Sequence, residues 1–292
     1  MNNPKKTLSI IGCGHVGKTL ARLWSQAGTF HIGEVVNRSE QSARSAVAMI
    51  GAGEVVASVE KMGPADVFLI GTPDNHIVEA CNTLVKSGVL AEGNVVFHCS
   101  GALPSSDLAS AAGCGAVIAS VHPVKSFADP DISVTSFSGT FCGVEGDEQA
   151  LAVLQAAFEN IGAETFRLEP RHKTLYHAAS VIVCNYLSAL MEFGLQCYGK
   201  SGLDRETAQR VMQPIVRGTI ENIFTLGTVD ALTGPIARGD HQVVSRQLEA
   251  ITDWEPQLGE LYRDLGRVAL HLSRQQGTAS PRSLETLAKL LE

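Results

Sequence analysis

The amino-acid sequence predicts an α/β fold in which a doubly wound parallel sheet is followed by an all-α C-terminal domain. From Thr7 to about Glu169, short apolar runs alternate with amphipathic stretches, the pattern of consecutive βαβ units. Several runs are apolar at successive positions, as strands covered on both faces are. After Pro170 the strand signals stop. We therefore expect two domains, residues 1–169 and residues 170–292.

Composition narrows the class of protein. A chain of 292 residues with 45% hydrophobic content can bury a core in each of two domains. The net charge of −7, without a run of Lys or Arg, argues against a nucleic-acid partner. No secretion signal is evident, and no segment approaches the roughly 18 uninterrupted apolar residues of a membrane span. Seven Cys without a CxxC pair suit reduced thiols better than disulfides or zinc. We expect a cytoplasmic protein with no metal, nucleic-acid or membrane partner.

The second half is predicted to be helical throughout. One long, largely apolar helix covers Lys173 to about Tyr198, and another covers Arg205 to Leu226. Two more helices follow, divided at Pro256, which suits a first helical turn, and a short last helix begins near Ser280. The first helix is apolar around most of its circumference, and one small domain leaves part of that surface uncovered. We therefore expect a homodimer formed through the C-terminal helices.

A glycine-rich loop follows the first apolar run. Leu8–Ile11 leads into a GxGxxG sequence, and an amphipathic helix opens at once. In this context the first glycine permits a tight turn, the second lets the backbone approach a pyrophosphate, and the third allows close helix–sheet packing. The sequence therefore predicts a Rossmann-type domain whose dinucleotide contacts include Gly12, Cys13, Gly14, His15, Val16 and Gly17.

The residues after the next apolar run favour NADP(H) over NAD. Many NAD enzymes carry an acidic residue here for the ribose hydroxyl, whereas this chain has Asn37, Arg38 and Ser39. Arg38 can pair with a 2′-phosphate in a bidentate way or stack on adenine, and its two neighbours offer hydrogen bonds. The alternative is that Arg38 is a solvated loop charge and Ser39 a helix N-cap.

Three further strand ends carry polar residues, at the edge where α/β sheets bind ligands. We expect Thr72, Pro73 and Ser100 to contact the cofactor, and Ser100 and Gly101 to lie beside the substrate. Asp74 is equally explained as a functional residue or as a helix cap, and His98 as a functional residue or as a buried histidine whose hydrogen bonds are made within the core. His122, at the third strand end, is a candidate catalytic residue.

The long helix carries a polar stripe. Lys173, His177, Ser180 and Cys184 follow helical spacing on an otherwise apolar helix, so the stripe needs a cavity, a ligand or polar partners. We predict that Lys173 and His177 form the proton-donating pair of a reductase. The alternative places Lys173 in solvent at the helix N-terminus and His177 in a hydrogen bond within the core.

Five segments together resemble a known family: the glycine-rich loop, residues 98–101, His122-Pro123, the Lys173-x-x-Tyr176-His177 segment with Asn185, and residues 232–240. They are similar to predicted oxidoreductases that join a Rossmann-like domain to a helical domain of unknown function. That family is similar to ketopantoate reductase, pyrroline-5-carboxylate reductase and the 6-phosphogluconate and β-hydroxyacid dehydrogenases, whose helical domain often dimerises. In the ketopantoate and β-hydroxyacid enzymes an Asn follows the catalytic Lys by four residues, whereas this chain has His177 there.

The resemblance implies an NADP-dependent oxidoreductase acting on a small molecule. We expect reduction of a carbonyl or imine, such as the 2-oxo acid ketopantoate, with Asn185 and Arg238 as further candidate substrate contacts. The sequence leaves two alternatives open, a deazaflavin-linked NADP reductase and a non-catalytic NADP-binding sensor or scaffold. The chain has no GxSxG or HExxH motif, which disfavours hydrolase and zinc-protease chemistry.

Overall fold

The computed structural model of the chain describes residues 5–292. Contacts divide it into two compact units, Met1–Val183 and Cys184–Glu292. The boundary predicted at 169/170 follows the last strand, whereas the contacts place the division later. The difference arises because the first turns of the long helix, including Lys173 and Tyr176, bond to residues of β6 (Val117–Pro123) and β7 (Phe141–Gly146).

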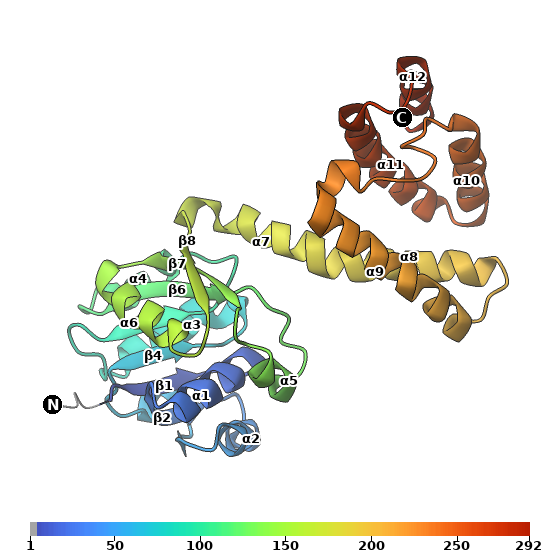
Figure 1. Ribbon diagram of the computed structural model, residues 1–292. Coiled ribbons are helices and arrows are strands. Elements are labelled where there is room, and N and C mark those ends of the chain that lie inside the picture. The colour runs from blue at the N-terminus through green and yellow to red at the C-terminus, as the bar shows by residue number, and fades with distance from the viewer. Residues whose placement is uncertain (1–4) are drawn as a thin grey trace. The chain divides into compact units, whose positions relative to one another are not determined.

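The first unit is built on an eight-stranded sheet with the order β3-β2-β1-β4-β5-β6-β7-β8 (Figure 1). The strands are β1 (Thr7–Ile11), β2 (His31–Val36), β3 (Glu54–Val55), β4 (Val67–Ile70), β5 (Val95–His98), β6 (Val117–Pro123), β7 (Phe141–Gly146) and β8 (Glu164–Arg167). All neighbouring strands are parallel except β6 and β7. The predicted parallel sheet is confirmed, with this one antiparallel pair that the sequence did not indicate. The connection from β6 to β7 contains the short helix α5 (Pro130–Thr135).

Helices cover both faces of this sheet, which confirms the doubly wound prediction (Figure 1). One core packs against α1 (His15–Ala27), α2 (Glu40–Ile50) and α6 (Glu148–Glu159), and the other against α3 (Ile77–Lys86) and α4 (Ala109–Ala112). Successive residues of β4 alternate between the two cores, so a continuously apolar strand serves both. Single 3₁₀ turns complete the unit, namely η1 (Val59–Lys61), η2 (Asp74–His76), η3 (Ser105–Leu108) and η4 (Pro170–His172).

The predicted long helix is present, with one interruption. Helix α7 (Lys173–Val181) passes through a π-helical turn, η5 (Ile182–Tyr186), into α8 (Leu187–Lys200). A π turn holds more residues than an α turn, so it rotates the residues after it about the helix axis. The predicted polar stripe is therefore broken before Cys184, which lies within the π turn and is exposed.

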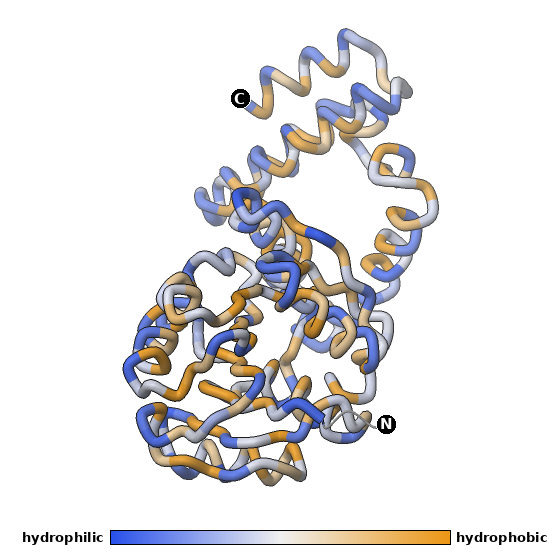
Figure 2. The backbone as a smooth tube through the Cα atoms, turned by 90° about the vertical axis from the view of Figure 1, so that its left-hand side faces the viewer, coloured by the Kyte–Doolittle hydropathy of each residue, from blue (hydrophilic) through white to orange (hydrophobic). Residues whose placement is uncertain are grey.

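The second unit is helical, as predicted. After α8 it contains α9 (Arg205–Asp230), α10 (His241–Trp254), α11 (Pro256–Gln276) and α12 (Pro281–Leu290). Asp240 caps α10 by accepting the Val243 N–H at 3.1 Å, and Ser280 caps α12. Along the helices that lead to the C-terminus, hydrophobic and hydrophilic residues alternate, as in amphipathic helices (Figure 2). Their apolar faces meet in a core that includes Val244, Leu270, Leu284, Leu287 and Leu291.

Much of the long helix is exposed. From Pro170 to Lys200 it has 31 residues, and its most apolar window has a mean hydropathy of 1.5 with 11% of its residues buried. By length and composition alone it could cross a membrane. The prediction concerned an uninterrupted apolar run, and Lys173, His177 and Asn185 interrupt this one. Its exposed side chains include Leu175, Ile182, Val183, Tyr186 and Leu190.

Candidate active site

The glycine-rich loop packs tightly against its neighbours at Gly12 and has free space beside Gly14. Gly12 has a φ of 83°, and a Cβ there would lie 2.6 Å from the Thr72 backbone nitrogen, so only glycine fits. Its N–H donates to the Val36 carbonyl at 2.8 Å. A Cβ on Gly14, by contrast, would meet no atom within 4 Å. The loop therefore keeps free space above Gly14, next to the start of α1.

These residues fit a dinucleotide pyrophosphate. Helix α1 begins directly after Gly14 with no side-chain cap and no acidic residue in its first turn. Its first N–H groups and its dipole favour an anion at this place. The Thr72 hydroxyl, close to Gly12, is buried and has no hydrogen-bond partner among residues 5–292. The loop thus combines an open approach, an uncapped helix N-terminus and an unused hydroxyl.

The side chains of the other loop residues contact the protein itself. The Cys13 side chain is buried, and burial raises the pKa of its thiol to about 12. His15 is exposed and donates from Nδ1 to the Phe127 carbonyl at 2.8 Å. Val16 packs against the core, and Gly17 lies close to the Cys13 sulfur. Only part of the predicted six-residue contact set is therefore open to a ligand.

Of the three residues predicted to select NADP, Arg38 alone has a side chain without a hydrogen bond or ion pair to residues 5–292. Asn37 accepts the Cys13 N–H at 2.5 Å and donates to Ser42 at 3.0 Å. Ser39 caps α2, as the alternative for it proposed. The Arg38 side chain is exposed. Asn37 therefore braces the glycine-rich loop, and Arg38 remains available to an anionic ligand.

His98 and Ser100 shape the turn after β5. His98 is completely buried; its Nδ1 accepts the Ser100 N–H at 3.1 Å and its Nε2 donates to the Pro104 carbonyl at 3.2 Å. Burial lowers the pKa of His98 to about 4. The interpretation of His98 as a satisfied buried histidine is confirmed. The Ser100 hydroxyl donates to Asp74 at 2.8 Å and accepts two backbone N–H groups, so its hydrogen bonds are already in use.

Lys173 lies inside the first unit. Its side chain has no exposed surface, and Nζ lies 3.4 Å from Glu145 Oε1 in β7. Nζ also donates to the Ser100 carbonyl at 3.1 Å and to the Ser120 hydroxyl. Glu145 accepts the backbone and side-chain donors of Ser105, each at 2.7 Å. The alternative that Lys173 is solvated is therefore wrong. Burial lowers the pKa of Lys173, and the nearby Glu145 carboxylate opposes that shift.

His122, Tyr176 and His177 form a second polar cluster at the same edge. His122 Nδ1 lies 2.9 Å from the Tyr176 hydroxyl, and the two rings meet edge to face. The rings of His122 and His177 are 5.8 Å apart. A Cβ on Gly101 would lie 2.5 Å from His177 Cδ2 and 2.8 Å from His122 Nε2. All three side chains are partly exposed, in contrast to Lys173.

Sequence reasoning missed three members of this arrangement. Tyr176 was noted only as part of a motif, although it lies three residues after Lys173, on the same side of a helix. Glu145 is a charged residue directly after the apolar run of β7, which is a signal for a buried partner. For Asp74 the sequence leaves a cap and a functional role equally open and does not indicate its partner, the Ser100 hydroxyl, which donates to its carboxylate.

Two family models match the chain. One, described as "Rossmann-like domain", matches residues 1–123, and the other, "Domain of unknown function (DUF2520)", matches residues 140–269. The chain combines a Rossmann-like domain with a DUF2520 domain. The first match contains Gly14 and His122, and the second contains Lys173 and Tyr176. Both matched regions therefore contribute side chains to the clusters at the sheet edge.

Solved structures share this architecture over nearly the whole chain. Protein TM1727 from Thermotoga maritima is 25% identical with a TM-score of 0.73, covering 92% of this chain and 99% of its own. The candidate NADP oxidoreductase BF3122 from Bacteroides fragilis is 21% identical with a TM-score of 0.73, covering 93% and 98%. Plasmodium falciparum pyrroline carboxylate reductase with NADP bound is 13% identical with a TM-score of 0.59, covering 100% of both chains. No curated protein matches the chain significantly in sequence.

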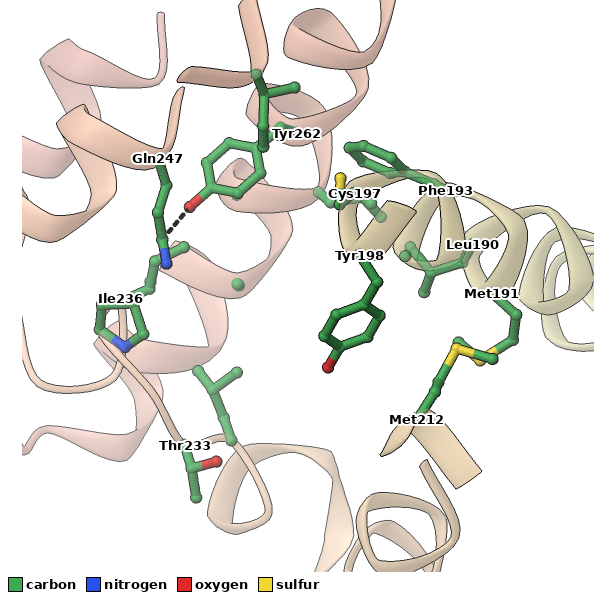
Figure 3. A pocket seen from close by; sticks show the side chains of 17 residues that line it. Leu190, Met191, Phe193, Cys197, Tyr198, Met212, Thr233, Ile236, Gln247 and Tyr262 are labelled. Carbon is green, nitrogen blue, oxygen red and sulfur yellow. Dashed lines mark hydrogen bonds between the residues drawn. The ribbon is translucent and has the colours of Figure 1, made fainter. Parts of the chain in front are cut away.

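The remaining candidate residues belong to the second unit, within the DUF2520 match. Asn185 is exposed in the π turn, and Arg238 is exposed in the loop between α9 and α10. This unit also contains a cavity of about 540 Å³ lined mainly by apolar side chains. Figure 3 shows Tyr262 donating a 2.7 Å hydrogen bond to Gln247 at its wall, with Tyr198 and Phe193 among the other lining residues.

Proposed function

We propose that the protein is an NADP-dependent oxidoreductase that uses NADPH to reduce the carbonyl or imine group of a small molecule. One observation carries the proposal. The open loop at Gly14 and the hydrogen-bonded His122–Tyr176 pair lie at one sheet edge, the edge where β1, β4, β5 and β6 end. A nucleotide loop and a partly exposed proton donor at one edge are the two parts that a reductase needs.

The similar structures support the same chemistry. Two of the three proteins compared above are named for NADP-linked or reductase activity, and both share the fold along almost the entire chain. Fold similarity alone does not transfer an activity. The support comes from the combination of that fold with polar side chains at the expected edge of the sheet.

Each part of the chain has a role in this proposal. The backbone at Gly14, the N-terminus of α1 and Thr72 would hold the pyrophosphate, with Pro73 flanking them, and Arg38 would pair with the 2′-phosphate. When bound, the reduced nicotinamide supplies the hydride. The chain's own residues supply the proton and the donor beside the developing oxyanion or amine. We assign those tasks to His122, Tyr176 and His177.

Ser100 and Gly101 are the proposed substrate contacts in the first unit. Gly101 leaves space beside His122 and His177, and Ser100 positions Gly101 through its own internal hydrogen bonds. Asn185 and Arg238 are exposed polar residues of the second unit, and an arginine can bind a substrate carboxylate in a bidentate way. A 2-oxo acid such as ketopantoate therefore remains a candidate substrate.

Turnover of NADPH tests the function directly. We expect oxidation of NADPH, followed at its absorbance band, with at least one acceptor from a set of 2-oxo acids, cyclic imines and flavin-like compounds. Reduction of a deazaflavin alone would favour the deazaflavin-linked alternative, for which the aromatic side chains around the 540 Å³ cavity are the supporting observation. Tight NADPH binding without turnover of any acceptor would favour the sensor or scaffold alternative.

Arg38 is expected to set the preference for NADPH. In Arg38→Ala the affinity for NADPH should fall about tenfold or more, because a charge-assisted pair with the 2′-phosphate is lost, while NADH affinity changes little. Fluorescence titration of both cofactors measures this. The exposed Arg210 of α9 gives a matched control, Arg210→Ala. Equal affinities for NADPH and NADH in the unmodified protein would contradict the preference itself.

We also propose that the protein is a cytoplasmic homodimer, in which a second copy covers the exposed apolar side of the long helix. Light scattering after size exclusion should give twice the chain mass at micromolar concentration. Val183→Glu, at a side chain that is 66% exposed, should weaken the dimer, whereas Val78→Glu in α3, at 45% exposure, should not. A monomer that floats with lipid vesicles would instead point to a membrane as the covering partner.

A further inference from the structure

We infer that Tyr176 and His122 act as one proton-donating relay of the proposed reductase, and that Lys173 is a positioning residue rather than the donor. The inference rests on the proposed function and deepens it, because it names the atoms that deliver the proton. Three observations carry it: the hydrogen bond between the two side chains, the space that Gly101 leaves at His122, and the complete burial of Lys173.

The hydrogen bond gives the relay its direction. The Tyr176 hydroxyl oxygen lies 2.9 Å from His122 Nδ1. In the relay that we infer, the hydroxyl is the donor of this bond, and the proton of the neutral imidazole is then on Nε2. Nε2 lies 2.8 Å from the position that a Cβ of residue 101 would occupy, and glycine leaves that position empty. The Nε2–H therefore borders a space where a substrate oxygen or nitrogen can approach.

The surroundings keep both groups neutral near pH 7. Burial lowers the pKa of His122 to about 4, and nearby His177 and Lys173 reinforce this while Asp74 opposes it. Burial also raises the pKa of Tyr176 to about 12. The charged and titratable groups that act on His122 thus come from α7, which carries Lys173, Tyr176 and His177, and from η2, which carries Asp74.

The proton transfer balances without a further reactant. As the substrate carbon accepts the hydride, the N–H bond at His122 Nε2 breaks and a new bond forms to the substrate oxygen or nitrogen. The Tyr176 O–H bond breaks and its proton moves to Nδ1, so the imidazole stays neutral with its two nitrogens exchanged. The tyrosinate that remains is a weaker base than an alkoxide, and water restores its proton.

Lys173 is poorly placed for the same task. Its Nζ has no exposed surface and is bonded to the Ser100 carbonyl, the Ser120 hydroxyl and Glu145. A proton on Nζ cannot reach a substrate without breaking this network. The Ser100 carbonyl directly precedes Gly101, so Lys173 instead fixes the backbone next to the His122 ring.

Nuclear magnetic resonance of imidazole nitrogens tests the relay independently of any substrate. In full-length protein with ¹⁵N-labelled histidine, with the His122 signals assigned from His122→Asn, we expect a neutral ring protonated on Nε2 from about pH 5 upward. Tyr176→Phe should shift the Nδ1 signal. The control Tyr262→Phe, which removes a tyrosine hydroxyl from α11, should leave it unchanged. A His122 that titrates near its ordinary pKa, or ignores Tyr176→Phe, overturns the relay.

Kinetics complete the test. Tyr176→Phe should lower kcat about 10²-fold while leaving NADPH binding unchanged, because a positioned acid is lost. In the unmodified protein the hydride-transfer rate should stay flat from about pH 5 to pH 9, since both donors remain neutral; an imidazolium donor would lose activity above about pH 6.5. If the protein oxidises NADPH but His122 lacks the neutral, Tyr176-dependent nitrogen signals described above, the relay is wrong and the proposed function stands.

If those signals are present but the protein does not bind NADPH, the proposed function is wrong and the hydrogen-bonded pair stands.

Discussion

Replacing Lys173 with Met is expected to destabilise the first unit more than any other single substitution in the site. The change removes the cation from a fully buried pair and leaves the Glu145 carboxylate, which is 2% exposed, without its counter-charge. Breaking a buried pair from one side typically costs about 3–5 kcal/mol. Glu145 keeps only its hydrogen bonds from Ser105, and two acceptors that Lys173 served, at Ser100 and Ser120, lose their donor.

Urea unfolding followed by circular dichroism measures the effect. Lys86→Met, at an exposed lysine of α3, serves as the matched control and should change the midpoint little. The double variant Lys173→Met with Glu145→Gln should recover part of the loss, because the uncompensated charge is gone. A Lys173→Met protein of normal stability that binds NADPH but lacks turnover would return Lys173 to the chemistry, as the sequence alone suggested.

The parts of the fold that depend on local sequence could be predicted well. A GxGxxG loop after an apolar run predicts a strand, a turn and a helix in that order, because each glycine is required where a side chain would clash or block close approach. Two helix starts could also be predicted from local sequence: Ser280 caps α12 through the N–H three residues later, and Pro256 begins α11 because its φ is fixed near the helical value. Continuous apolar runs indicated a sheet covered on both faces.

The candidate site could be predicted only in part, because its partners meet across the sheet. The spacing of Lys173 and His177 placed both on one side of a helix. No sequence pattern near Lys173 indicated that it would be buried in an ion pair with Glu145, on a strand distant in the sequence. The bond between His122 and Tyr176 likewise joins residues 54 positions apart. The antiparallel return of β7 escaped prediction for a similar reason, since strand direction depends on the path of the connection rather than on strand composition.

The π turn at Ile182–Tyr186 also could not be predicted from the spacing of polar and apolar residues. Helical spacing assumes an unbroken α-helix, and a single wider turn shifts the face of all later residues. Ser180 precedes the turn and Cys184 lies within it, so the predicted stripe ends between them. Such turns are frequent at functional sites, and this one follows directly on the helix that carries Tyr176 and His177.

Gly101→Ala is the substitution expected to damage the proposed chemistry most while leaving the cofactor loop intact. The new methyl group would lie 2.5 Å from His177 Cδ2 and 2.8 Å from both Cε1 and Nε2 of His122, distances that real Cβ atoms do not show. His122 is held by Tyr176, so the ring cannot turn away without breaking that 2.9 Å bond. The methyl group also fills the space in which a substrate atom would meet Nε2.

We therefore expect kcat/KM of Gly101→Ala to fall about 10²-fold or more, the scale of a misplaced reacting group, with NADPH affinity within about twofold of the parent. Stopped-flow turnover and cofactor titration measure the two quantities. Gly113→Ala, whose new Cβ would come no closer than 3.5 Å to another atom, is the matched control and should keep full activity. If Gly101→Ala turned over normally and kept the His122 nitrogen signals of the parent, the space beside His122 would not be where substrate binds. The donor would then have to be sought at His177, whose ring borders the same glycine from the helix side.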